Sequence, residues 1–166
     1  MKKLFIIRHA KSDWGDFTLP DFERPLNERG KADAPVMAKR LLSKKIKIDA
    51  FISSPARRAK KTCKLFCKEF HIDDNEIIFI EKLYNAQVEI FFETILSLDN
   101  KYEQVAIFAH NPGVTDFANR LCKNVHIDEM PTCSIFAVEA DITDWKKFKQ
   151  SEKSFLFFDY PKNLIN

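Results

Sequence analysis

The chain has 166 residues, of which 45% are hydrophobic and 31% charged, with 16 Phe but only 3 Gly. A chain of this length buries roughly 70% of its unfolded surface on folding, and this composition excludes a disordered or fibrous protein. The 27 Lys and Arg exceed the 24 Asp and Glu enough for a net charge of +3. These basic residues are scattered, which argues against nucleic acid as a partner, although a mildly positive chain suits an anionic substrate. We expect one domain over residues 1–166.

The first apolar run, Leu4–Ile7, is too short for a signal peptide or a membrane span. We therefore expect a cytoplasmic protein that does not bind membranes. The four cysteines form no Cys-x-x-Cys pair, and a reducing compartment would keep them as thiols: Cys63, Cys67, Cys122 and Cys133.

Short apolar runs alternate with segments of helical periodicity. The runs predict buried strands at 4–7, 50–52, 77–80, 105–109, 135–138 and 155–158. Helical spacing is found from about Asn27 to Leu42, over 59–70 and over 91–98. Pro35 lies inside the first helical segment, where an interior proline costs ~3 kcal/mol, so we expect a kink or a broken start. The alternation predicts an α/β domain with a largely parallel central sheet covered on both faces.

Two histidines follow two of these strands. Arg8 and His9 end the first strand, and His110 follows the strand at 105–109. In open α/β sheets, ligands bind beyond the carboxyl ends of strands, so both positions suit a site. After His110, Asn111 is expected to cap a helix whose first residue is Pro112.

A third strand end carries two arginines. In Ser54-Pro55-Ala56-Arg57-Arg58, Ser54 is a candidate N-cap and Pro55 a candidate first helical residue. A helix N-terminus with a guanidinium is an anion site, and the forked donors of arginine match phosphoryl oxygens. Each motif alone is also explained by an ion pair, an ordinary helix start or a turn. Their occurrence at three successive strand ends favours one phosphoryl-binding site.

These motifs resemble those of the histidine phosphatase superfamily, which has the phosphoglycerate mutase-like fold, a three-layer α/β/α architecture. The resemblance rests on 8–12 (Arg-His-Ala-Lys-Ser), 54–59 (Ser-Pro-Ala-Arg-Arg-Ala) and His110. The short chain, Arg-His-Ala in place of Arg-His-Gly, and the stretch 21–30 resemble SixA-type phosphohistidine phosphatases.

The resemblance implies a role for each residue. His9 would be the nucleophile, attacking phosphorus as a neutral imidazole to form a phosphohistidine that water hydrolyses. Arg8, Arg58 and His110 would bind the phosphoryl oxygens. Ser12 would lie near the phosphate, while Arg57 would be a surface charge or an outer helper. This scheme requires no metal and no cofactor.

The general acid of the larger phosphatases and mutases has no clear counterpart. Asn85 aligns with it and cannot donate a proton as an acid does. A phosphoramidate leaves more easily than an alkoxide, so this loss fits a phosphohistidine substrate. Glu81 is a possible acid if the alignment shifts, and Asp13 or Asp16 are further candidates.

Three hypotheses remain. The favoured one is a phosphatase of protein phosphohistidine, whose partner would be a phosphorylated protein such as a histidine phosphotransfer domain. Residues 13–24, which include Trp14 and Phe17, would form an active-site loop that contacts this protein. The alternatives are a phosphatase of small monoesters on the same fold and a non-catalytic module that binds phosphorylated ligands; mutase activity is the least expected.

Overall fold

A computed structural model describes residues 1–164, so the last two residues of the expected domain, 165–166, lie outside the described part. The strands are β1 (Lys2–Arg8), β2 (Ala50–Ser53), β3 (Ile78–Phe79), β4 (Gln104–Ala109), β5 (Ile135–Ala140) and β6 (Lys153–Asp159). The α-helices are α1 (Glu28–Ser43), α2 (Arg57–Glu69), α3 (Val88–Leu96) and α4 (Gly113–Leu121). Short 3-10 turns lie at η1 (Asp21–Glu23), η2 (Asp74–Glu76), η3 (Glu81–Leu83) and η4 (Trp145–Lys147).

The strands form one sheet of order β3-β2-β4-β1-β5-β6. The pairs β3–β2, β2–β4 and β4–β1 are parallel, whereas β5 runs antiparallel to both β1 and β6. The expected largely parallel sheet is therefore confirmed, with antiparallel pairing at one side. Because β1 and β4 are central and buried, their carboxyl ends are fixed by sheet neighbours on both sides.

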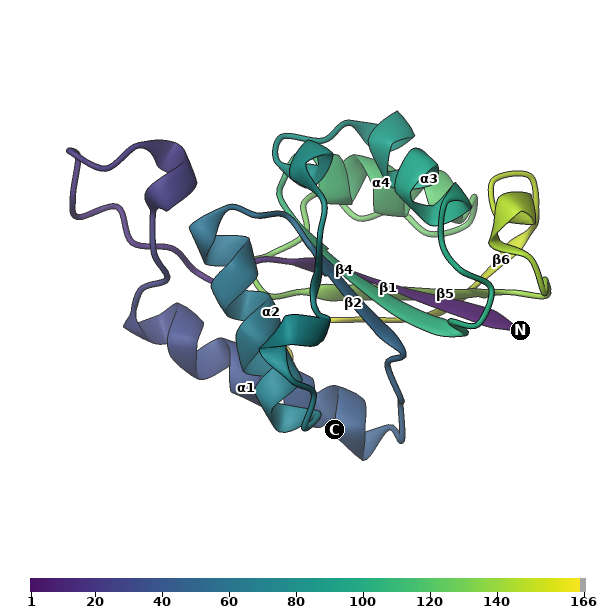
Figure 1. The fold of residues 1–166 in the computed structure, drawn as a ribbon, viewed down its shortest axis with the longest axis horizontal. Coiled ribbons are helices and arrows are strands. Elements are labelled where there is room, and N and C mark those ends of the chain that lie inside the picture. The colour runs from purple at the N-terminus through teal and green to yellow at the C-terminus, as the bar shows by residue number, and fades with distance from the viewer. Residues whose placement is uncertain (165–166) are drawn as a thin grey trace.

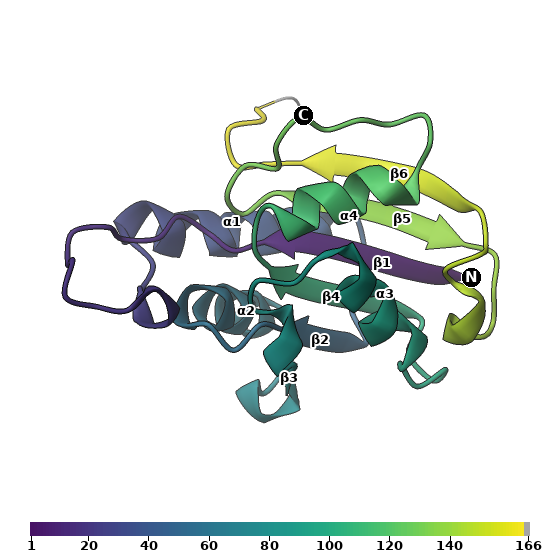
Figure 2. The same cartoon turned by 90° about the horizontal axis from the view of Figure 1, so that it is seen from above.

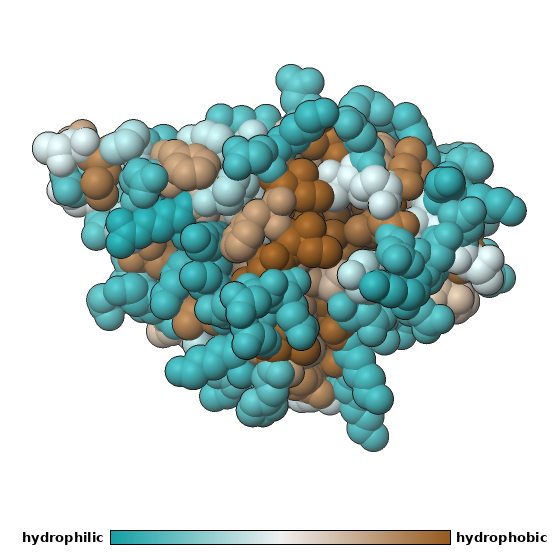
Figure 3. All heavy atoms as spheres, viewed as in Figure 1, coloured by the Kyte–Doolittle hydropathy of each residue, from teal (hydrophilic) through white to brown (hydrophobic). Residues whose placement is uncertain are grey.

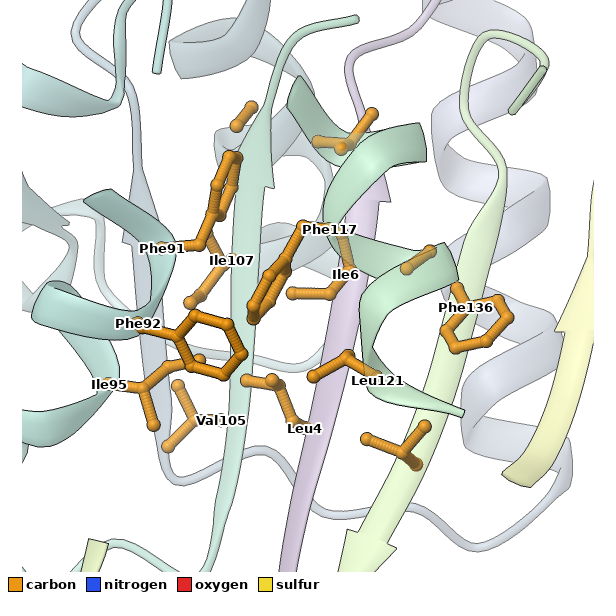
Figure 4. Close-up of a cluster of buried hydrophobic side chains, with 14 of the residues drawn as sticks. Leu4, Ile6, Phe91, Phe92, Ile95, Val105, Ile107, Phe117, Leu121 and Phe136 are labelled. Atoms are coloured by element: carbon orange, nitrogen blue, oxygen red, sulfur yellow. The ribbon is translucent and has the colours of Figure 1, made fainter. Parts of the chain in front are cut away.

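Helices cover both faces of the sheet, which confirms the three-layer architecture (Figures 1 and 2). Helices α1 and α2 pack on one face, against alternate side chains of the strands that include Phe5, Ile7 and Phe108. Helices α3 and α4 pack on the other, where Phe91 and Phe117 stack with ring centroids 4.9 Å apart (Figure 4). This alternation of faces is what a sheet buried on both sides requires.

Two expected helix starts are wrong. Helix α2 begins at Arg57 with Ala56 as N-cap, not at Pro55 with Ser54. The Ser54 hydroxyl accepts from the Ala56 N–H and lies against His110. Helix α4 begins at Gly113, with Pro112 as N-cap. The Asn111 side chain instead donates to the Met130 carbonyl and accepts from the Thr115 hydroxyl.

The expected broken start of the first helix is also wrong. Helix α1 is one uninterrupted helix with Pro35 inside it, and the Asn27 side chain caps it by accepting from the Gly30 N–H. Ala34, Met37 and Leu41 are buried against the sheet. Burial of apolar surface at roughly 25 cal/mol per Å² offsets the cost of the interior proline.

The four cysteines are free and buried. Within residues 1–164, no helix has the length and apolar character needed to cross a membrane.

Candidate active site

The parallel pairing of β1 and β4 brings His9 and His110 together. Arg8 is in register with Ala109, so each histidine is the first residue beyond its strand. The His9 N–H donates to the Ala109 carbonyl at 3.1 Å, which extends the ladder by one step. The ring centroids of His9 and His110 are 5.2 Å apart, and both side chains are buried. The sheet therefore sets the spacing of the two imidazoles.

The tautomer of His9 follows from its hydrogen bond. Its Nδ1 lies 2.7 Å from the Ala10 carbonyl oxygen, which only accepts, so Nδ1 carries the proton and Nε2 is unprotonated. The Nε–H of Arg58 donates to this Nε2 at 3.4 Å. Burial, followed by the neighbouring His110, Arg58 and Arg8, holds the pKa of His9 well below 6.5. His9 is thus a neutral imidazole with an unprotonated Nε2, as a nucleophile requires.

Thr62 links the His9 loop to helix α2. Its hydroxyl accepts from the Ala10 N–H at 2.9 Å and donates to the Arg58 carbonyl at 2.7 Å. The Ala10 residue that holds the His9 ring is therefore tied to the helix that carries Arg58. Thr62 is fully buried, so no water competes for these bonds.

Arg58 lies in the first turn of α2 and is buried. Its Nη1 donates to the Asp21 carbonyl at 2.7 Å and its Nη2 to the Asp21 carboxylate at 3.0 Å. The adjacent Arg57 points to solvent, where its Nη1 donates to the Glu23 carbonyl at 3.3 Å. Successive helical side chains differ in direction by about 100°, so only one of the two arginines can face His9.

Ser54 orients His110. Its Oγ lies 2.7 Å from Nε2 of His110 and already accepts from the Ala56 N–H. A serine hydroxyl has one donor and two acceptor positions, so it pairs with Nε2 of His110 in either tautomer of the ring. Burial, with Arg58 next in effect, lowers the pKa of His110 to about 3. His110 is therefore neutral at neutral pH.

Two buried nitrogen atoms of the site have no partner among the described residues. They are Nε of Arg8 and Nδ1 of His110. Nη1 of Arg8 donates to the Met130 carbonyl at 2.8 Å, and the Glu129 carboxylate is 4.0 Å away. An unpaired buried donor is costly, so donors of this kind beside a guanidinium fit a bound oxyanion.

Asp21 in η1 connects the site to the segment between β1 and α1, which projects from the body of the molecule (Figures 1 and 2). Its carboxylate accepts from the Tyr84 hydroxyl at 2.6 Å, from Arg58 and from Arg24 at 3.2 Å. These hydrogen bonds, with that from Tyr84 the strongest influence, lower the pKa of Asp21 to about 2. The same contact raises the pKa of Tyr84. Asp21 is therefore an anion at neutral pH.

The other expected residues lie at varying distances from His9. Ser12 is buried and accepts from Nη1 of Arg24 at 2.8 Å, so it reaches Arg58 only through Arg24 and Asp21. Glu81 is exposed in η3, and in the described chain its side chain forms no bond to the site. The residue of this turn that projects toward His110 is Tyr84, with the two ring centroids 5.6 Å apart.

The remaining acid candidates are also outside the site. Asp13 and Asp16 are exposed and accept from the backbone of Gly15 and Thr18. Asn85 is exposed. Within residues 1–164, no three His, Cys, Asp or Glu side chains lie close enough to hold a metal ion.

Sequence reasoning did not identify Asp21 or Tyr84 as site residues, nor Ser54 as the partner of His110. Asp21 is 37 positions from Arg58 and 63 from Tyr84, so no local spacing indicates these contacts. The one available signal was the placement of Asp21 in a loop expected to border the site.

Family models and solved structures identify the class of protein. Residues 4–85 match the family model of the histidine phosphatase superfamily (branch 1). These residues carry β1, α1, β2, α2 and the turn that holds Tyr84, and the rest of the described chain completes the sheet. Over these residues the chain matches the histidine phosphatase superfamily, and its fold is the phosphoglycerate mutase-like fold.

Several known proteins are similar to it. An uncharacterized chloroplastic protein of Arabidopsis thaliana is 28% identical over 156 residues, which are 88% of this chain and 70% of that protein. The structure of the protein histidine phosphatase SixA complexed with tungstate has a TM-score of 0.83 at 22% identity and covers 98% of this chain and 99% of that one. A candidate SixA phosphohistidine phosphatase from Agrobacterium tumefaciens has a TM-score of 0.80 at 24% identity, covering 96% and 98% of the two chains.

Proposed function

We propose that this chain is a phosphatase of protein phosphohistidine that acts through a covalent phosphohistidine on His9, with residues 1–166 as a single catalytic domain. The observation that carries the proposal is the His9 imidazole, neutral and with its Nε2 lone pair beside Arg58. The similarity of the fold to SixA supports the substrate class, and the tungstate bound in that protein supports an oxyanion site.

In the first step, Nε2 of His9 attacks phosphorus in line with the leaving group. The bond from phosphorus to the substrate nitrogen breaks and its electron pair stays on that nitrogen, so that the substrate ring, already protonated on its other nitrogen, leaves as neutral imidazole. Arg8, Arg58 and the Nδ1–H of His110 donate to the phosphoryl oxygens, whose charge develops in the transition state. This leaves the phosphoryl group on His9.

In the second step, water attacks the phosphoryl group from the side vacated by the leaving group. The bond from phosphorus to Nε2 breaks, the electron pair returns to His9, and the proton of the water is released to solvent. Orthophosphate leaves. The Nδ1–H bond from His9 to Ala10 persists throughout, so the ring keeps the orientation that exposes Nε2.

The acid–base character of the site favours a phosphoramidate over an alkyl ester. Asp21, which lies on Arg58, is ionised and cannot supply a proton near neutral pH. Glu81 is turned to solvent. An alkoxide requires protonation as it leaves, whereas a ring protonated on its other nitrogen leaves as neutral imidazole, whose conjugate acid has a pKa of only about 6.5.

A second candidate function is hydrolysis of small aryl phosphates. The Tyr84 hydroxyl, hydrogen-bonded to Asp21 and close to His110, is the one proton donor that favours it. A phenolate needs less protonation than an alkoxide, so a tyrosine donor suffices for this class. Tyr84→Phe would then reduce aryl phosphate turnover and leave phosphohistidine turnover unchanged.

The test is phosphate release from a histidine phosphotransfer domain phosphorylated on histidine, beside p-nitrophenyl phosphate. His9→Ala should abolish release while keeping the circular dichroism spectrum, and the exposed His71→Ala is the matched control. An alkaline quench followed by mass spectrometry should find the phosphoryl group on the peptide that contains His9.

Each alternative has its own result. Efficient turnover of the aryl phosphate alone would assign the small-ester function. Phosphate binding without turnover of either substrate would assign the non-catalytic binding module. Full activity in His9→Ala would reject the nucleophile.

A further inference from the structure

A groove of about 460 Å³ lies beside the site, between the start of α1 and the first half of α2. Pro25 and Leu26 form its apolar part. The rest of its lining is cationic: Lys31, Arg57, Lys60, Lys61 and Lys64. No acidic side chain lines it, which is unusual for a chain in which acidic and basic residues are nearly balanced.

Most of these cations are not neutralised by the protein. Lys31 pairs with Glu28 at 3.4 Å. In the described chain, no carboxylate lies within 4.0 Å of the other four cationic groups. Arg57 donates to a backbone carbonyl, and Lys60 lies over the ring of Phe79. The groove is therefore an unpaired basic surface, and hydrophilic side chains cover much of the region of α1 and α2 in Figure 3.

Helix α2 joins this groove to the site. Arg58 faces His9, while Arg57, one residue earlier, lines the groove. At 1.5 Å per residue, Lys61 and Lys64 lie about 6 and about 10 Å further along the helix axis than Arg57. An extended peptide spans roughly 3.3 Å per residue, so residues one to four positions from a phosphohistidine bound at His9 could reach them.

A second basic cleft is less suited to an acidic partner. It includes Arg8, Lys11, Arg29 and Lys162 but also Glu129, and Arg29 pairs with Asp33 at 3.5 Å. The groove on α2 is the one without a competing carboxylate in its lining.

We propose that the α2 groove binds carboxylates of the phosphorylated protein that flank its phosphohistidine, so that the enzyme selects substrates with an acidic segment next to the modified residue. The inference rests on the proposed phosphohistidine phosphatase function. Charge complementarity supports it, because paired charges at such a surface raise the association rate and orient the substrate.

The test uses two phosphohistidine peptides that differ only in flanking residues, Asp and Glu in one and Asn and Gln in the other, together with free phosphohistidine. The enzyme variant is Lys61→Glu/Lys64→Glu. The control is Lys146→Glu/Lys147→Glu, which makes the same charge change in η4. Lys61→Gln/Lys64→Gln replaces the first variant if that variant fails to fold by circular dichroism.

We expect the wild-type enzyme to have a kcat/KM at least tenfold higher for the acidic peptide at low salt, with the preference shrinking as salt is raised. Lys61→Glu/Lys64→Glu should abolish that preference and change turnover of free phosphohistidine less than twofold. The η4 control should keep the preference.

The failures are distinguishable. Wild-type enzyme that hydrolyses both peptides equally, or a groove variant that keeps the preference, overturns the groove inference alone. Wild-type enzyme that hydrolyses no phosphohistidine substrate overturns the proposed function and the inference together. If the groove variant loses binding to a single-stranded oligonucleotide with unchanged peptide turnover, the groove binds nucleic acid instead.

Discussion

Asp21 holds Arg58 through two oxygens at once. Its carbonyl accepts from Nη1 at 2.7 Å and its carboxylate from Nη2 at 3.0 Å, while Nε of the same guanidinium faces His9. Asp21 therefore occupies the two Nη donors of Arg58, which an oxyanion substrate also needs. Arg58 is oriented by the same residue that competes for it.

Removing the charge of Asp21 should strengthen oxyanion binding. In Asp21→Asn the backbone carbonyl still holds Nη1, but the negative charge beside Arg58 is gone. We expect the inhibition constant of orthophosphate to fall about threefold to tenfold, a modest effect because the Asp21 side chain is half exposed. Competitive inhibition assays measure this constant. A rise would mean that the carboxylate acts mainly to position Arg58.

Arg58 and Arg57 should differ sharply when each is replaced by lysine. Arg58→Lys loses the forked donors beside His9, and we expect kcat to fall about 100-fold or more, the size of effect seen when one main transition-state donor is lost. Arg57→Lys keeps an exposed charge, so kcat should change less than twofold. Single-turnover kinetics on phosphohistidine give both numbers. Equal losses in the two variants would contradict the assignment of the buried arginine.

Thr62 should stabilise the His9 loop through its hydroxyl. Thr62→Val leaves the buried Ala10 N–H without an acceptor, and we expect the free energy of unfolding to fall by about 1–3 kcal/mol. Thr62→Ser keeps the hydroxyl, so its free energy of unfolding should stay close to that of the wild-type protein. Chemical denaturation of the two variants provides the comparison. Similar losses in both would show that the methyl group, not the hydrogen bond, matters.

The imidazoles of the site should remain neutral in mildly acidic solution. Because burial lowers the pKa of His9 well below 6.5 and that of His110 to about 3, their ring protons should not shift between pH 8 and pH 5. NMR titration follows these signals, with the exposed His71 and His126 assigned in the same spectra. A titration of His9 near pH 6.5 would contradict the neutral nucleophile.

The same lowered pKa values set how stability depends on pH. Well above pH 6.5, His9 and His110 are neutral in both the folded and the unfolded chain. Below it, the unfolded chain takes up protons that folded His9 and His110 do not, so the free energy of unfolding should fall from about pH 6.5 toward pH 3. Asp21, with a pKa of about 2, adds a loss from about pH 4 to pH 2. Urea denaturation across this range tests it, and His110→Gln should show a shallower decline.

The sequence predicts the parts of this protein that depend on local pattern. The apolar runs of β1 and β4 are continuous, so strand positions and the two histidines beyond them follow directly. The resemblance to the family favours Arg58 over Arg57 as the phosphoryl-binding arginine. In the structure, Arg58 lies beside His9. The predicted start of α2, at Pro55, is wrong, since the helix begins at Arg57. The Ser54 hydroxyl faces a histidine 56 positions away, a contact that no helix-capping rule anticipates.

The interpretation of Glu81 shows a second limit. A carboxylate near a strand end suggests an acid, but the direction of a side chain in a 3-10 turn depends on the packing of that turn. Tyr84 contacts Phe22, at 5.1 Å between rings, and Asp21, and both belong to a segment more than 60 positions away. Contacts between residues so far apart in the sequence form only when the chain has folded, so local sequence patterns do not predict them.

The register of β1 on β4 has a consequence for how activity relates to folding. The His9 N–H donates to Ala109, the last residue of β4, which is one of the two central strands. Amide hydrogens of central strands exchange at the highest free energies of opening. Asp21 lies on an exposed turn, which local opening should release at a much lower free energy. We therefore expect the amide of His9 to exchange more slowly than the amides around Asp21. Substrate could displace Asp21 without disturbing the strand that holds His9.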